Sequence, residues 1–204
     1  GLGARAPGTE DAIREKDVIR MLRDAFPSAG LGDDTAVFQR EAGETLFASD
    51  AVVEGVHFRK EYFSPGQAVQ KAISSCVSDV YAMGGTPEKI LVTAGLPEGT
   101  GEGAVTGIVA GIAAACAVYD IQLAGGDTVF SPGGTFFDIS IIGRSGVGGA
   151  VLRSGATAGD LIFVTGECGY SLAGLRLLGM LFDGGGAGLS DGPRGRESLR
   201  ARDR

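Results

Sequence analysis

"SPGQAVQKAISSCVSDVYAMGG" (residues 64–85) contains the start, the apolar face and the end of one long helix. Ser64 is a favourable N-cap residue, Pro65 suits the first helical position, and two consecutive glycines are typical of a helix end. Between these ends, apolar residues recur every three or four positions. They are Val69, Ala72, Ile73, Cys76, Val77 and Val80. Such a helix has to bury its apolar face against another layer of structure.

Short strands and further helices are predicted on both sides of this segment. Apolar runs bounded by Gly, Pro and polar turn residues indicate the strands, and helical spacing of apolar residues indicates the helices. The predicted strands are 35–38, 45–48, 90–94, 121–124 (a buried strand) and 135–142, and the predicted helices are 11–26 and 103–119. This mixture predicts an α+β fold, with a mixed β-sheet and flanking helices.

The organisation changes after residue 142. The glycine-rich stretch 143–149 is interpreted as a hinge, so that residues 1–149 form an N-terminal domain. A strand at 161–165 and a helix at 171–182 indicate that a second α/β domain begins in 150–182. Residues 183–204 have few apolar side chains and mix glycine with charge, which predicts a disordered tail and an incomplete second domain.

Composition limits the classes of function. The formal net charge of −7 argues against a nucleic-acid partner, because phosphate backbones are bound by clustered Lys and Arg. Cys76, Cys116 and Cys168 are scattered, which favours free thiols in a reducing compartment. We find no signal peptide and no apolar run of the ~18 residues that a membrane span needs, and therefore expect a cytoplasmic protein without a membrane partner.

Several aspartates lie next to predicted strands or beside the apolar face of the predicted helix. Asp33 and Asp34 precede a strand, Asp50 and Asp127 follow strands, and Asp79 lies beside the apolar face of the helix. A half-buried carboxylate such as Asp79 is unfavourable unless it is paired or binds a metal, and Lys71 lies on another part of that helix. Carboxylate and hydroxyl oxygens suit Mg²⁺. Each aspartate alone is also compatible with turn or surface chemistry, but together they favour magnesium ions around a polyphosphate.

Three further features have both an ordinary and a functional interpretation. His57 is the one histidine, and such a residue is more often structural than catalytic. The sequence GGDT at 125–128 is either a tight turn or a place where the backbone approaches a phosphate. Arg153 is either a surface charge or a bidentate phosphate ligand.

The motifs in this order resemble those of the thiamine-monophosphate kinase family. They are GLGDDTAVF, LFASDAVVEGVHF, KAISSCVSDVYAMGGTPE, LAGGDT, LRSGATAGDLIFVTG and GYSLAGLRLL. That family belongs to the superfamily of aminoimidazole ribonucleotide synthetase, selenophosphate synthetase and a hydrogenase maturation factor. The resemblance implies the aminoimidazole ribonucleotide synthetase-like fold for the N-terminal, ATP-binding domain. Selenophosphate synthetase would need a reactive Cys before Cys76, and none is present.

The resemblance also implies an activity, which is ATP-dependent phosphorylation of thiamine monophosphate to thiamine diphosphate by direct, Mg²⁺-assisted transfer. The resemblance also implies a homodimer that joins two N-terminal sheets. The reaction requires no catalytic base, because phosphoryl transfer depends mainly on positioning and charge neutralisation. The implied metal ligands are Asp34, Ser49, Asp50, Asp79 and Asp127. The implied ATP contacts are Gly126, Asp127 and Arg153, and His57 is the implied contact to thiamine monophosphate.

The sequence departs from the family pattern at three places. Ala48 stands where the family has a hydroxyl, and Val109 stands where we expect an aromatic contact to the nucleotide. Family members are longer and carry a second-domain DxSDG motif, whereas the tail here has GLSDG at 188–192. The alternative function is therefore that of a truncated, inactive nucleotide-binding and dimerisation remnant of the same family.

Overall fold

The computed structural model describes residues 35–40 and 43–182. The chain divides into two compact units, one of which extends to Ala156, while the other includes Thr157 to Phe182. The predicted helix 11–26, Asp33, Asp34 and the tail 183–204 lie outside the described residues.

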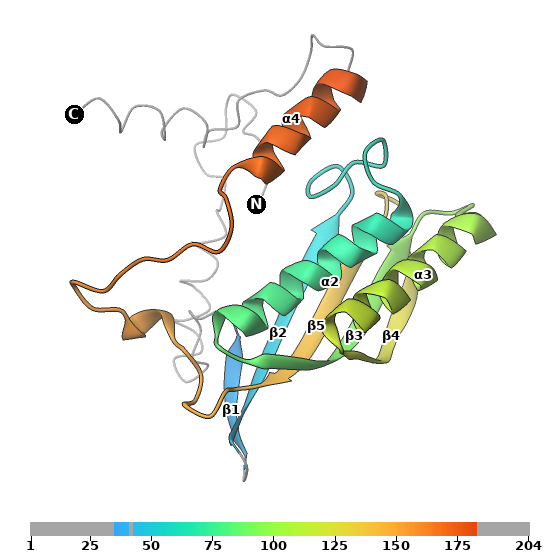
Figure 1. Cartoon of the computed structure of the whole chain (residues 1–204). Coiled ribbons are helices and arrows are strands. Elements are labelled where there is room, and N and C mark those ends of the chain that lie inside the picture. Colours follow the sequence, from blue (N-terminus) through green and yellow to red (C-terminus); the bar gives the residue numbers. More distant parts are fainter. Residues whose placement is uncertain (1–34, 41–42, 183–204) are drawn as a thin grey trace, which may run out of the picture. The chain divides into compact units, whose positions relative to one another are not determined.

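A five-stranded mixed sheet forms the centre of the first unit (Figure 1). Its strands are β1 (Ala36–Arg40), β2 (Gly43–Val53), β3 (Thr86–Leu96), β4 (Gln122–Phe130) and β5 (Phe136–Arg144). They lie in the order β1-β2-β5-β3-β4. Only the neighbours β3 and β4 are parallel, and the helix between them supplies the crossover that a parallel pair needs. The predicted α+β mixed sheet is confirmed.

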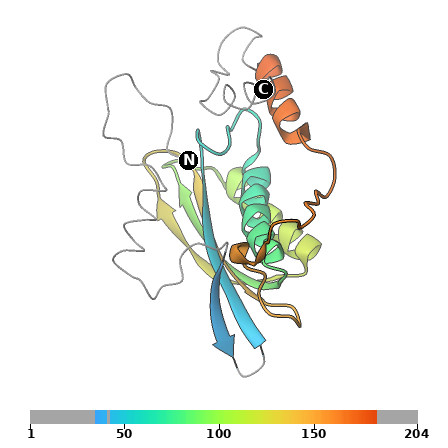
Figure 2. The ribbon, with the colours of Figure 1, turned by 90° about the vertical axis from the view of Figure 1, so that its left-hand side faces the viewer.

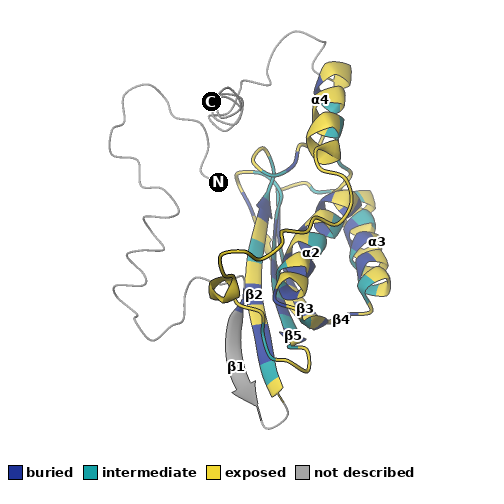
Figure 3. Ribbon diagram, turned by 60° about the vertical axis from the view of Figure 1, so that its left-hand side comes forward, coloured by how far each residue is buried: buried dark blue, intermediate teal, exposed yellow. Residues whose placement is uncertain are grey.

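Helix α2 (Pro65–Ala82) covers one face of this sheet, as Figures 1 and 2 show. It begins with a capping box in which the Gln67 N–H donates to Ser64 Oγ and the Ser64 N–H donates to Gln67 Oε1. Its predicted apolar face is fully buried (Figure 3). The sheet side chains that complete this core are every second residue of three strands: Leu46, Ala48, Val52, Ile90, Val92, Ala94, Phe137, Ile139 and Ile141.

Helix α3 (Glu102–Tyr119) packs against α2 at a contact between glycines. A Cβ on Gly111 would lie 2.4 Å from the Gly66 carbonyl oxygen, and a Cβ on Gly66 would lie 2.6 Å from the Gly107 carbonyl oxygen. The backbones therefore approach as closely as they do because these residues have no side chain. By length and mean hydropathy (1.6) α3 could cross a membrane, contrary to the expectation that the chain has no apolar run of this length. In the domain it packs against α2, and 17% of it is buried.

Several strands are longer than predicted. Asp50 and Asp127 do not follow strands, because β2 continues to Val53 and β4 continues to Phe130. The ladder partners explain this extension, since Asp50 lies opposite Ile139 and Asp127 lies opposite Thr93. The predicted strand 121–124 is found, but the expectation that it is buried holds only for Ile121, which precedes β4, because every residue of β4 itself is exposed.

The segment after the sheet remains attached to the first unit. Gly143, the start of the predicted hinge, is buried inside β5. Further on, the Ala150 N–H donates to Glu44 Oε2 (2.6 Å) and the Val151 N–H donates to the Met83 carbonyl (2.9 Å).

In the second unit, helix α4 (Tyr170–Phe182) confirms the predicted helix. The predicted strand 161–165 is wrong, because these residues have no regular structure. Leu161, Ile162 and Phe163 are at least 80% exposed. A strand needs a neighbour for its backbone N–H and C=O groups, and the described part of this unit contains no strand to pair with.

The glycine contact between α2 and α3 gives a matched pair of substitutions. Gly111→Ala places a methyl group against the Gly66 backbone, whereas the nearest atom to a Cβ on Gly107 is 4.0 Å away. Both changes gain the same helix propensity over glycine, so the difference between them measures overpacking. We expect Gly111→Ala to be less stable than Gly107→Ala by about 2 kcal/mol in the free energy of unfolding, measured by urea denaturation. Equal stabilities would contradict the contact.

Candidate functional site

Asp50 is positioned by the alternation of β2. Leu46, Ala48 and Val52 of this strand are buried under α2. Asp50 lies between Ala48 and Val52 on the same face of the strand, so it also points at this helix. Accordingly, the Asp50 carboxylate accepts a hydrogen bond from Ser75 Oγ of α2 at 2.6 Å. The strand supplies a carboxylate and the helix supplies a hydroxyl.

Asp79 lies one helical turn after Ser75, on the same side of α2. It is half-buried, as its place beside the apolar face predicted. Asp50, Ser75 and Asp79 therefore all contribute oxygen atoms to the region between β2 and α2. These are the hard donors that Mg²⁺ binds.

The pKa of the Cys76 thiol is affected by the carboxylates of this region. Its side chain is fully buried, and its thiol donates to the Ile139 carbonyl at 3.3 Å. Burial raises the pKa of the Cys76 thiol to about 12, with further contributions from the nearby carboxylates of Asp79, Asp50 and Asp138. A thiol with this pKa stays protonated at neutral pH. Asp79 and Asp50 therefore both lie close enough to act on this one buried thiol.

Ser49 points to the opposite face of the sheet from Asp50. Its hydroxyl donates to Asp138 Oδ1 (3.1 Å) and lies 3.4 Å from Ser140 Oγ. Asp138 was not among the predicted site residues. The signal for it was the segment FFDISII, in which polar residues occupy every second position of an apolar strand. Because Ser49 and Asp50 face opposite ways, their side chains cannot bind the same ion.

Asp127 lies in the exposed strand β4, where its carboxylate accepts the Thr128 N–H at 2.8 Å. The strand order puts β5 and β3 between β2 and β4, so the backbones of Asp50 and Asp127 are separated by about 14 Å at ~4.8 Å per strand spacing. That separation is too large for one Mg²⁺, whose bonds to oxygen are about 2.1 Å long. Ligation by both aspartates would require at least two ions.

Gly126 has a structural reason to be glycine. A Cβ there would lie 1.9 Å from the Val92 carbonyl oxygen of the neighbouring strand. The register between these strands also shifts at Ile90 and Leu91. The sequence suggested that a phosphate approaches the backbone closely at this glycine, but in the structure the neighbouring strand β3 does so. The ATP contact of Gly126 stays a prediction.

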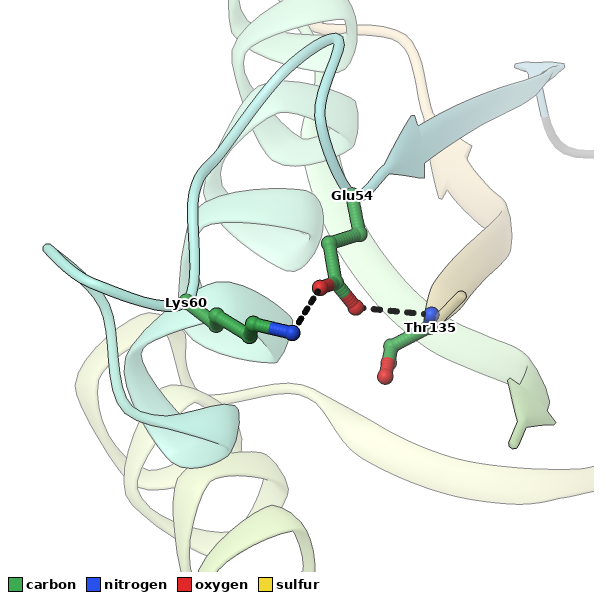
Figure 4. A network of polar contacts seen from close by, with 3 residues as sticks. All are labelled: Glu54, Lys60 and Thr135. Carbon is green, nitrogen blue, oxygen red and sulfur yellow. Dashed lines mark hydrogen bonds and ion pairs between the residues drawn. The ribbon is translucent and has the colours of Figure 1, made fainter. Parts of the chain in front are cut away.

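His57 lies in a tight turn that follows β2. The turn closes when the His57 N–H donates to the Val53 carbonyl (2.9 Å) and the Val53 N–H donates to His57 Nδ1 (3.1 Å). Glu54 fixes the turn to the start of β5, because its Oε2 accepts the Thr135 N–H at 2.9 Å (Figure 4). Its other oxygen lies 3.7 Å from Lys60 Nζ.

The remaining predicted positions are spread over the chain. Arg153 is exposed in the short 3₁₀ helix η1 (Arg153–Gly155). Ala48 is buried under α2, and Val109 is 60% exposed on α3. Asp34 lies outside the described residues.

Within residues 35–40 and 43–182, no group of three or more His, Cys, Asp or Glu side chains is arranged to hold one metal ion. Mg²⁺ usually takes only one or two protein carboxylates, with water and phosphate oxygens completing its shell. The donor set of Asp50, Ser75 and Asp79 fits an ion that arrives with a nucleotide. It does not fit an all-protein metal cage.

Comparison with known proteins gives the family. The model of "AIR synthase related protein, N-terminal domain" matches residues 32–145. The thiamine-monophosphate kinase of Bacillus subtilis (strain 168) is 36% identical over 160 residues, which are 78% of this chain and 49% of that protein. The thiamine-monophosphate kinase of Aquifex aeolicus (strain VF5) is 36% identical over 166 residues, which are 81% and 53% of the two chains.

The solved structure of AaThiL complexed with AMPPCP and TMP is similar in fold and sequence. It has a TM-score of 0.77 and 33% identity, over 84% of this chain and 56% of that one. The chain thus spans about half the length of the curated relatives that it matches. Because the family model matches more than half of its residues, this chain belongs to the AIR synthase related protein family, of which it carries the N-terminal domain.

Proposed function

We propose that this chain supplies the ATP- and magnesium-binding half of a thiamine-monophosphate kinase, which transfers the γ-phosphoryl group of ATP to thiamine monophosphate. The observation that carries the proposal is the pair of Asp50 and Ser75 beside Asp79, at the interface of β2 and α2. The likeness to AaThiL, a protein solved with AMPPCP and TMP, supports the choice of nucleotide and substrate.

Each predicted residue has a proposed role in this reaction. Asp34, Ser49, Asp50, Asp79 and Asp127 would hold magnesium ions, which neutralise phosphate charge when they are bound. Gly126, Asp127 and Arg153 would contact ATP, and His57 would contact thiamine monophosphate. Bound in line, the substrate phosphate can attack the γ-phosphorus directly while the bond from that phosphorus to the bridging oxygen breaks and ADP leaves. No side chain therefore has to form a covalent intermediate or act as a base. The protein then contributes positioning and charge.

The sheet face that carries Ser49 is the proposed site of homodimerisation. Phe47 and Leu91 on this face are 38% and 44% exposed, and α2 and α3 cover the opposite face. Burial of such side chains between two sheets is a favourable way to remove them from water.

The magnesium proposal is tested by Asp79→Asn, which keeps the size of the side chain and removes its charge. We expect formation of thiamine diphosphate from thiamine monophosphate and Mg-ATP to fall roughly 100-fold, because a charge that stabilises the transferring group is lost. Asp120→Asn is the matched control, since Asp120 has φ 52° at the end of α3 and asparagine tolerates that conformation. Turnover that Asp79→Asn leaves unchanged would contradict the metal assignment, and Mg-ATP binding without turnover would favour the inactive remnant.

The dimer proposal is tested by Leu91→Lys, which places a charge in the middle of the exposed sheet face. We expect sedimentation equilibrium to give a dimer for the unmodified chain and a monomer for this variant, since burying an unpaired ammonium group is costly. Val118→Lys changes an equally apolar residue that is 74% exposed on α3, and it should leave the dimer intact. A monomeric unmodified chain would refute the proposal.

A further inference from the structure

The turn that carries His57 fixes which nitrogen of its imidazole bears the proton. A backbone N–H can only donate, so the bond from the Val53 N–H at 3.1 Å makes Nδ1 an acceptor. A neutral ring of this kind carries its proton on Nε2. The part of the chain that the structure describes offers no hydrogen-bond partner to Nε2.

The Val53 N–H is available for the His57 ring because of how β2 ends. Successive N–H groups of a strand point to opposite sides. The Glu54 N–H points to β5, where it donates to the Thr135 carbonyl (2.9 Å), so the Val53 N–H points to the other side. The partner on that side, β1, pairs with β2 only as far as Phe47. The His57 ring therefore satisfies a backbone donor that no described strand reaches.

Lys71 of α2 holds the same turn from the helix side. Its Nζ donates to the His57 carbonyl and lies 5.7 Å from the centre of the Phe63 ring. A charge-assisted hydrogen bond of this type is stronger than a neutral one. Lys71 thus joins the turn to α2, while Glu54 joins it to β5 (Figure 4).

We propose that Lys71 is a positioning residue, which together with the Val53 N–H holds a neutral His57 so that Nε2–H is presented as a hydrogen-bond donor to the phosphate monoester of the substrate. Lys71 does not touch the substrate in this scheme and acts through His57. The inference deepens the proposed function and rests on it for the identity of the acceptor, because an anionic phosphate oxygen is the natural partner of a fixed N–H donor.

Nitrogen NMR of the imidazole tests the positioning without any activity. The chain has one histidine, so ¹⁵N-histidine labelling gives a single pair of ring signals. We expect an unprotonated Nδ1 and a protonated Nε2 in the unmodified chain at neutral pH. Lys71→Met should average the two signals toward a tautomer mixture, and Lys71→Arg, which keeps the charge and the donor, should restore them.

The matched control is Lys60→Met, because Lys60 is also exposed and contacts the same turn through Glu54. It should leave the ring signals unchanged. An Nδ1–H tautomer in the unmodified chain would overturn the inference, and so would Lys71→Met signals identical to those of the unmodified chain.

A titration with thiamine monophosphate, in the presence of Mg²⁺ and AMPPCP, tests the acceptor. We expect the Nε2 signal to shift with thiamine monophosphate and not with thiamine, which lacks the phosphate. Lys71→Met should raise the midpoint about ten-fold, the effect of losing roughly one hydrogen bond to a charged group. If Nε2 does not respond to thiamine monophosphate, the substrate contact of the proposed function is refuted, whereas the ligand-free signals still decide the role of Lys71.

Discussion

The packing of α2 against one face of the sheet is the constraint on which the rest of the domain depends. This helix presents an unbroken apolar face that is fully buried against β2, β3 and β5. Because the apolar face is fully used in this contact, polar groups of the helix that approach the sheet have to come from its flanks. Ser75 and Asp79 occupy one such flank, next to Asp50. The oxygen atoms of the candidate site are therefore held by the same contacts that stabilise the fold.

The strand period imposes a second constraint, because neighbouring residues of a strand face opposite sides of the sheet. Ser49 and Asp50 are adjacent in sequence, yet one bonds to Asp138 on the open face and the other to Ser75 under α2. Residues with oxygen-bearing side chains that are adjacent in a strand therefore do not belong to one site. Together with the strand spacing between Asp50 and Asp127, this geometry favours several ions that share phosphate oxygens over one protein cage.

Much of the fold could be predicted from the sequence because its helices have clear local signals. The bounds of α2 could be predicted nearly to the residue from the capping residue Ser64, the period of the apolar residues and the terminal glycines. Strand ends were less predictable, since Asp50 and Asp127 look like turn residues until their ladder partners are known. The exposed segment 161–165 shows the reverse case, in which a strong local strand signal finds no partner strand among the described residues of its unit.

The candidate site was predictable in its residue types but not in its geometry. The type of side chain at Asp50, Asp79 and His57 indicated the chemistry, but the tautomer of His57 and the contact of Lys71 depend on a turn and a helix that meet only in the folded chain. Asp138 was missed because its signal is an alternation and not a motif. Gly126 shows that one residue can satisfy a packing constraint and still resemble a phosphate-binding glycine.

The proposed function requires that a divalent ion and ATP bind together beside Asp50 and Asp79. Paramagnetic broadening of backbone amide signals by Mn²⁺, which takes the same oxygen ligands as Mg²⁺, tests it most directly when ATP is present. The expected result is broadening concentrated at residues 49–51 and 75–80, and its loss in Asp50→Asn. Broadening that is absent from these residues, or that Asp50→Asn leaves unchanged, would contradict the account.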